Sequence, residues 1–150
     1  MGLISDLGAG PIALDTAIFI YFIEEHADYM PHLAPLFSAV ASGECEIVTS
    51  AVTLLEVLVV PYRTGNIPLA ERYEALLTRS RGMHLVETDR SQLRAAAQVR
   101  AHYRVRTPDA LQLVAALSKR CTALLTNDRE MPELPGLKIF QLRKYLTNRL

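Results

Sequence analysis

Short apolar segments of strand length alternate with helical segments along the chain, and this alternation is the strongest constraint on its fold. The strand-like segments lie at about 12–15, 46–49, 84–87, 122–126 and 137–142. Strands that alternate with helices form parallel sheets with helices on both faces. We therefore expect an α/β protein with three layers, in which helices flank a central, mainly parallel sheet of four to five strands.

The expected helices have recognisable ends. They follow Asp15, run from about Met30 to Gly43, from about Ser50 to Val60, over Ile67–Arg81, from a cap at Asp89 to about Tyr103, and over Ala110–Lys119. Pro61 and Gly65 are expected to end the third of these helices. Thr107 and Pro108 indicate the start of the last one, with a hydroxyl cap followed by proline. Residues 142–150 form either a short helix or a frayed tail.

The size and hydropathy of the chain favour one domain outside the membrane. Its 150 residues suit a single domain over 1–150. No apolar run approaches the roughly 20 residues that span a bilayer. The first ten residues lack the basic segment and long apolar core of a secretory signal, so we expect a cytoplasmic protein.

The net charge of zero hides a strong charge asymmetry between the two parts of the chain. Residues 1–62 hold eight acids and no Lys or Arg, whereas residues 63–150 hold all 16 cations, mostly arginines. Arginine binds phosphate in a bidentate manner better than lysine does. The alternative is a solvated helix surface on which arginine fills polar faces.

Four acidic residues lie where apolar segments end or turn, and each has an ordinary structural explanation. Asp15 could cap a helix, Asp109 could complement a helix dipole, and Asp128 could form an Asx turn. Glu56 is harder to explain, because it is the only charge between Glu46 and Arg63 and the helix around it is apolar on all sides. We expect that helix to bury its carboxylate.

Taken together, the four acids predict a metal site. The carboxyl ends of parallel strands gather at one edge of a sheet, where ligands bind, so Asp15, Glu56, Asp109 and Asp128 can converge on one cleft. Buried carboxylates need a partner, and hard oxygen ligands favour Mg²⁺ or Mn²⁺ over zinc. The four histidines show no metal-ligand spacing.

The motifs around these acids resemble those of PIN-domain ribonucleases, in particular VapC-type toxins of toxin–antitoxin systems. ALDTAIFIYFI resembles the first motif, with Asp15 and the hydroxyl of Thr16. TSAVTLLEVL, RTPDALQLVAAL and LLTNDREM resemble the second, third and fourth motifs, and the last includes Thr126 and Asn127. The order and spacing of the motifs match over essentially the whole chain, and no acid is missing.

The resemblance implies a metal-dependent endoribonuclease, a homodimer and a small antitoxin that covers the cleft. The carboxylates would hold Mg²⁺ or Mn²⁺, and Glu56 would coordinate the metal or position the attacking water. Thr16, Thr126 and Asn127 are expected to fix the carboxylates by hydrogen bonds, although capping and strand packing would also account for the two threonines.

Cations beside the acids are the candidates for RNA binding, because an acidic site repels the phosphate backbone. The candidates are Arg100, Tyr103, Arg104, Arg106 and Arg129, with the tyrosine placed to stack on a base. The alternative is that the arginines are solvated or form ion pairs with nearby acids.

Two other functions remain open at this point. One is a PIN-like module that binds RNA or protein without catalysis, because acids alone do not establish turnover. The other is a phospho-receiver signalling domain, which also places acids at strand ends. The receiver would need a lysine late in the chain at the end of a strand, whereas Lys138 begins one.

Overall fold

In the computed structural model, which describes residues 2–146, five parallel strands form one sheet. The strands are β1 (Ile12–Leu14), β2 (Ile47–Ser50), β3 (Met83–Val86), β4 (Ala123–Thr126) and β5 (Lys138–Gln141). Their order across the sheet is β3-β2-β1-β4-β5, and every neighbouring pair is parallel. The predicted α/β class and the mainly parallel sheet are confirmed.

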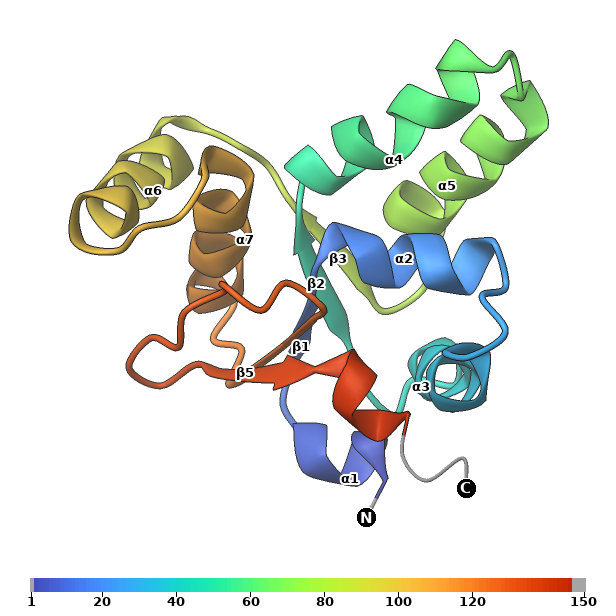
Figure 1. The fold of residues 1–150 in the computed structure, drawn as a ribbon, viewed down its shortest axis with the longest axis horizontal. Coiled ribbons are helices and arrows are strands. Elements are labelled where there is room, and N and C mark those ends of the chain that lie inside the picture. The colour runs from blue at the N-terminus through green and yellow to red at the C-terminus, as the bar shows by residue number, and fades with distance from the viewer. Residues whose placement is uncertain (1, 147–150) are drawn as a thin grey trace.

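Helices cover both faces of this sheet. They are α1 (Leu3–Leu7), α2 (Thr16–Ile23), α3 (Met30–Ala41), α4 (Val52–Arg63), α5 (Ile67–Arg79), α6 (Arg90–His102), α7 (Thr107–Ser118) and the short 3₁₀ helix η1 (Leu142–Tyr145). Figure 1 shows α6 and α7 on one side of the sheet and α2 to α5 on the other, which gives the three predicted layers.

The three central strands, β1, β2 and β4, are mostly apolar because helices cover both faces of the sheet there. Every residue of β1, β2 and β4 is buried. Ile12 and Leu14 point into the core beneath α2 and α3, whereas Ala13 and Leu124 point into the core beneath α7. Each strand of the sheet centre therefore supplies side chains to two cores, and the helices on the two faces are held at fixed positions relative to one another.

Several boundaries differ from the sequence predictions. Helix α4 continues through Pro61 to Arg63, so the predicted stop was wrong: Pro61 is buried, and the chain keeps helical geometry for two more residues. Helix α7 begins at Thr107 with Arg106 in the cap position and no side-chain cap, so the predicted threonine cap was wrong as well. The hydroxyl of Thr107 instead accepts a hydrogen bond from Arg100.

The two ends of the described chain lie beside each other. Helix α1 was not predicted, and its Leu3 and Leu7 are buried in the core beneath α2 and α3. The Tyr145 hydroxyl of η1 donates to Asp6 Oδ2 of α1 at 2.5 Å. The 3₁₀ helix accounts for the first part of the predicted short helix or tail over 142–150, and residues 147–150 lie outside the described residues.

The topology gathers the carboxyl ends of three strands at one edge of the sheet. Strand β1 lies in the centre, between β2 and β4, and its register places Leu14 beside Leu125. The chain leaves β1 and β2 into α2 and α4, and it leaves β4 into the loop of Asp128. Ligands bind at such an edge in open parallel sheets. Among residues 2–146, no helix has the length and apolar character to cross a membrane.

Candidate active site

All four predicted acids line one open cleft of about 650 Å³ at this edge of the sheet. Asp15 follows β1, Asp128 follows β4, Glu56 lies in the second turn of α4, and Asp109 lies in the first turn of α7. The remaining walls come from α2, the start of α7, the loop after β4 and η1; they consist of Thr16, Ala17, Ile20, Tyr21, Arg106, Asn127, Glu130 and Arg143.

Asp15 is fixed by hydrogen bonds to both of its carboxylate oxygens. Its Oδ1 accepts from the Thr16 backbone N–H at 2.8 Å, so the residue caps α2, and its Oδ2 accepts from the Thr126 hydroxyl at 2.6 Å. Burial raises the pKa of Asp15, and the charge of Asp128 adds to the rise. The two hydrogen bonds and the charge of Arg106 oppose it. Asp15 therefore combines a structural cap with a place in the cleft.

Thr126 connects the two acids that follow the central strands. Its hydroxyl donates to Asp15 and accepts from the Asp128 backbone N–H at 2.9 Å. Asp128 Oδ1 in turn accepts from the Glu130 backbone N–H at 2.9 Å, which is the Asx-type turn proposed as its ordinary explanation. Because Thr126 is fully buried, this arrangement holds the loop after β4 against the end of β1.

Glu56 faces the cleft beside Thr16. The Thr16 hydroxyl donates to Glu56 Oε1 at 2.5 Å and thereby joins α2 to α4. The expectation that an all-apolar helix buries this carboxylate was wrong, because Glu56 is only half-buried. Helix α4 leaves Leu55 64% and Val60 56% exposed, so its apolar character does not reflect burial on all sides.

A buried polar network beneath the cleft supports Thr16, and its centre is Gln112 of α7. Gln112 is 2% exposed, and its Nε2 donates to the Thr53 hydroxyl at 2.7 Å and to Thr16 Oγ1 at 3.4 Å. Its Oε1 accepts from the Ser50 backbone N–H at 3.1 Å and from Thr49 Oγ1 at 3.2 Å. The sequence signal for Gln112 was its polar side chain within the apolar run Ala110–Ala116, because a polar residue in a buried helix needs hydrogen-bond partners.

Asp109 is the most strongly perturbed acid of the cleft. The residue is 8% exposed. Burial raises its pKa to about 6, and the charges of Asp128 and Asp15 contribute to the rise. Arg106 opposes it through an ion pair, with Nε 3.4 Å from Asp109 Oδ2. The Arg106 side chain is 79% exposed, so solvent screens this pair and the cleft keeps an excess of negative charge.

The chemistry of the cleft fits a hard divalent cation, although its carboxylates do not form a closed cage. Among residues 2–146, no group of three or more His, Cys, Asp or Glu side chains is clustered closely enough to hold a metal ion. The three aspartates nevertheless interact through their charges, and oxygen is the ligand type that Mg²⁺ and Mn²⁺ prefer. Mg²⁺ keeps several waters when it binds, so it does not need every ligand from the protein.

Three of the predicted RNA-binding residues lie together beside the acids. Arg100, Arg104 and Arg106 line a second hollow of about 330 Å³, which shares Arg106, Asp109 and Glu130 with the main cleft. The Arg100 guanidinium donates to the Val105 carbonyl and the Thr107 hydroxyl, each at 3.0 Å. Arg100 therefore shapes the α6–α7 loop, while Arg104 and Arg106 extend the cleft along one side.

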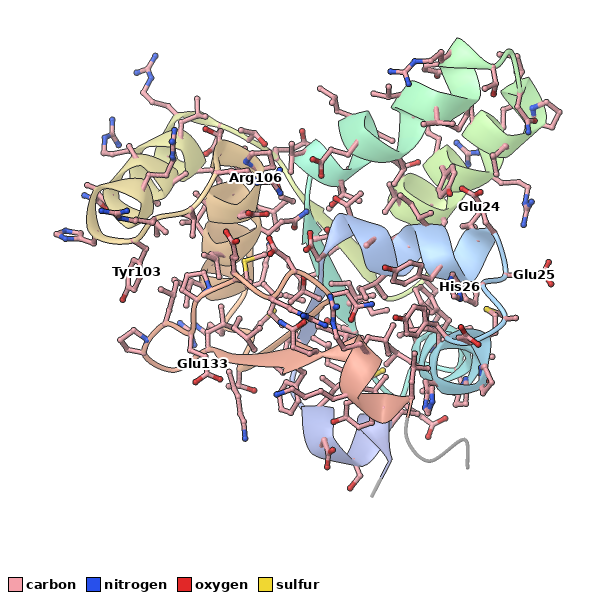
Figure 2. All side chains as sticks on the ribbon, viewed as in Figure 1. Glu24, Glu25, His26, Tyr103, Arg106 and Glu133 are labelled. Carbon is pink, nitrogen blue, oxygen red and sulfur yellow. The ribbon has the colours of Figure 1, made fainter. Side chains whose placement is uncertain are left out.

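The structure does not bring the other two predicted RNA-binding residues into the cleft. Tyr103 lines a separate hollow together with Val99, Leu134 and Pro135, and in Figure 2 it lies apart from Arg106, on the side of Glu133. Stacking of Tyr103 on a base stays a prediction, and it would take place outside the cleft that holds the four acids. Arg129 is exposed and lines neither of the two hollows.

Two residues of the cleft were missed by the sequence analysis. Arg143 of η1 lines it from the end of the described chain, and Tyr21 of α2 lines it beside Asn127. The Asn127 side chain donates from Nδ2 to the Tyr21 hydroxyl at 3.4 Å and accepts from the Arg143 backbone N–H at 2.8 Å. Arg143 lies in a segment predicted only as a short helix or tail, and no motif marked it.

A comparison with protein families gave a match over most of the chain. A family model described as PIN domain matches residues 12–137, which include all four acids and every strand except the last. A comparison with curated protein sequences gave no match.

Several solved structures have a similar fold over most of the chain. A toxin–antitoxin complex from Klebsiella pneumoniae has a TM-score of 0.64 at 19% identity, covering 87% of this chain and 97% of that chain. VapBC2 from Rickettsia felis, bound to a promoter DNA fragment, has a TM-score of 0.61 at 18% identity, covering 87% and 98%. FitAcB from Neisseria gonorrhoeae has a TM-score of 0.58 at 17% identity, covering 88% and 98%. At these identities the likeness establishes the fold.

Proposed function

We propose a function from the premise that this chain belongs to the PIN domain family. The proposed activity is metal-dependent endonucleolytic hydrolysis of RNA phosphodiester bonds, as the toxin of a toxin–antitoxin pair. The observation that carries it is the convergence of Asp15, Glu56, Asp109 and Asp128 on one cleft at the carboxyl ends of the central strands. PIN domains are generally nucleases, and this arrangement has the chemistry that such a reaction needs.

In this proposal Asp15, Asp109 and Asp128 hold Mg²⁺ or Mn²⁺. When bound, such an ion lowers the pKa of a coordinated water and offsets charge on the phosphate. Thr126 orients Asp15 through its 2.6 Å hydrogen bond and fixes the backbone of Asp128, so two of the three aspartates are positioned before substrate arrives. The raised pKa of Asp109 supports its role, because a nearby cation would relieve the repulsion that contributes to the rise.

Glu56 is proposed to position the attacking water or to add a further ligand. Thr16 occupies Oε1 of Glu56 with its hydroxyl at 2.5 Å. Oε2 can then accept a proton from a water that attacks the phosphorus in line with the leaving oxygen. Thr16 is itself contacted from beneath by Gln112, so the orientation of Glu56 depends on a network that reaches from α2 to α7.

The RNA backbone is proposed to pass along the side of the cleft formed by the start of α7. Arg106 and Arg104 line the hollow that continues from the cleft, and both are exposed. Exposed arginines beside an acidic centre can hold phosphates while the acids act on the bond between them. Arg129 stays a prediction as a more distant phosphate contact.

The proposed partners are a second copy of the chain and a small antitoxin. The similar solved structures are toxin–antitoxin complexes, some with DNA, which supports an antitoxin for this chain. Because the cleft is acidic, we expect an Arg or Lys of the antitoxin to reach Asp15 or Asp109. An antitoxin complex that leaves both carboxylates open to bulk water would contradict this. Cytoplasmic location and a single PIN domain over residues 1–150 also stay predictions.

Cleavage of single-stranded RNA by the purified chain tests the proposed activity. We expect internal cleavage in Mg²⁺ or Mn²⁺ and none in EDTA. Asp109→Asn should lower the rate more than about 100-fold, because even residues that only support metal ligands commonly cost 10- to 100-fold when they are changed. Asp89→Asn is the matched control: Asp89 caps α6 outside the cleft, and asparagine caps equally well. Undiminished cleavage by Asp109→Asn in Mg²⁺ would refute the assignment.

A PIN-like binding module without catalysis is the second candidate. It is favoured by the observation that the carboxylates among residues 2–146 form no closed metal cage. Such a module would bind RNA or a protein but would leave RNA intact in both metals. The phospho-receiver alternative is wrong, because the chain belongs to the PIN domain family and its strand order is 3-2-1-4-5, whereas receivers have the order 2-1-3-4-5.

A further inference from the structure

Arg143 brings a positive charge into the acidic cleft from the side of the sheet that is opposite α7. It lies in η1, which follows β5, and η1 contacts α3 through Tyr145, whose ring centroid is 6.2 Å from that of His32. Figure 1 shows η1 close to α3, with α7 on the other side of the sheet. Arg106 reaches the same cleft from the start of α7. The cleft therefore has an arginine on each side of its four acids.

Arg143 is held in place by the loop that carries Asp128. Its backbone N–H donates to Asn127 Oδ1 at 2.8 Å, and its Nη2 donates to the Asn127 carbonyl oxygen. Gln141, two residues earlier, donates from Nε2 to the Asp128 carbonyl at 2.9 Å. These bonds join η1 to the end of β4, so little conformational freedom remains for Arg143 to lose when a ligand binds.

The positive charge of Arg143 is available to a ligand in the cleft, although not through every nitrogen of its guanidinium. Its Nε is shielded from solvent and has no hydrogen-bond partner among the described residues, so a ligand in the cleft must reach the Nη atoms instead. Arg143 forms no ion pair with any acid of the cleft; the ion pairs found within residues 2–146 are His84–Glu46 and Arg106–Asp109. A half-buried cation without an ion-pair partner is stabilised by an anion, and the Nη donors of arginine suit the oxygens of a phosphate.

We infer that Arg143 binds a backbone phosphate of the nucleic acid, on the other side of the scissile bond from the phosphates held by Arg104 and Arg106. This inference rests on the proposed nuclease function. It specifies the substrate class as a strand that crosses the cleft and presents a phosphate on both sides of the acids. Asn127 is then a positioning residue, because it fixes the backbone and the guanidinium of Arg143.

The salt dependence of RNA binding tests the inference. Binding of a single-stranded RNA of about 12 nucleotides is measured in an Asp109→Asn background, so that the RNA survives. We expect Arg143→Ala to reduce the slope of log affinity against log salt by about 0.7, which corresponds to one phosphate contact. Arg143→Lys should keep the slope of the parent, because it keeps the charge. Lys144→Ala, which removes a neighbouring exposed cation, should leave the slope unchanged.

A purely structural role of Arg143 predicts a different result. Arg143→Ala would then melt at a lower temperature than the parent, while the salt dependence of its RNA affinity would have the same slope as that of Lys144→Ala. This result would overturn the inference. Arg143→Gln is neutral but keeps an N–H donor for the Asn127 carbonyl, so it gives the same slope test if Arg143→Ala does not fold. If the wild type does not cleave RNA but Arg143→Ala still reduces the salt slope of RNA binding, only the proposed activity is contradicted. Absence of RNA binding by the parent would defeat both.

Discussion

Helices α4 and α7 are both apolar, and each carries one carboxylate of the cleft near its start, yet only α7 is covered on all sides. Helix α7 packs against β1 and β2 on one side and α6 on another, and it buries every residue from Asp109 to Ala116. Helix α4 packs against α5 and α2 and buries only Thr53, Val57 and Pro61. In Figure 1 the α4–α5 pair projects beyond the sheet. Apolar composition therefore does not distinguish a helix inside the core from one with an exposed apolar face.

The difference also separates the two carboxylates. Asp109 lies in the first turn of the covered helix α7, and its pKa is raised to about 6 mainly by burial. Glu56 lies on the half-open helix, where the Thr16 hydroxyl fixes one of its oxygens. The surroundings of Asp109 thus disfavour its ionised form, whereas a hydrogen bond orients Glu56. These properties suit holding a cation and positioning a water, respectively.

Alanine substitutions on the two helices should show the largest contrast. Leu113→Ala in α7 removes a fully buried side chain and should lower the free energy of unfolding by about 2–5 kcal/mol. Val59→Ala in α4 removes a side chain that is 41% exposed and should change it by no more than about 0.5 kcal/mol. Urea denaturation at low protein concentration measures both. Equal losses in the free energy of unfolding would show that this face of α4 is covered within the monomer.

The pH dependence of stability should report the covered acid of α7. The pKa of Asp109 is about 6 in the folded chain and about 3.9 in the unfolded one, so the protonated form favours folding. This contribution is complete below about pH 4 and is lost as the pH rises through about 6. At pH 7 Asp109→Asn should therefore be more stable than the wild type by about 1–2 kcal/mol, and at pH 4 the advantage should disappear. An equal difference at both pH values would rule out this cause.

Substitutions on the exposed face of α4 should have the smallest effect on the stability of the monomer, but they should weaken dimer formation. The resemblance to VapC-type toxins implies a homodimer. Helix α2 does not supply an apolar face for it through Ile18, Phe19 and Ile23, because these residues are buried in the core. Leu55, Val59 and Val60 remain exposed. We expect light scattering to give a dimer at micromolar concentration and the double variant Leu55→Ser, Val60→Ser to shift it toward monomer. A monomeric wild type would contradict the homodimer.

Local sequence patterns were sufficient to predict the sheet and the convergence of the acids. Apolar strands such as Ile47–Ser50 are recognisable because both faces are buried, and strand ends meet at one edge in any parallel sheet. The position of Asp15 after β1 and of Asp128 after β4 followed from this rule alone.

Features that depend on tertiary packing could not be read in the same way. Pro61 was expected to end α4, but the buried proline lies within the helix. Tyr103 lies outside the cleft and lines a separate hollow with Val99 and Leu134. Arg143 enters the cleft only because Asn127 binds η1. These positions depend on packing with residues that are distant in sequence or on how a helix face is covered. Neither can be recognised from a local sequence pattern.

Titration of the RNA-free protein with Mn²⁺ or Mg²⁺ tests most directly whether the four acids hold a cation together. A ligand at 100 times its dissociation constant stabilises the folded state by about 2.7 kcal/mol, which corresponds to a rise in melting temperature of about 5–10 °C for a chain of this size. We expect this rise in the wild type and in the control Asp89→Asn, and its loss in Asp109→Asn, which removes one of the three aspartates proposed to hold the ion. A wild-type melting temperature that does not change over the titration would contradict the metal site.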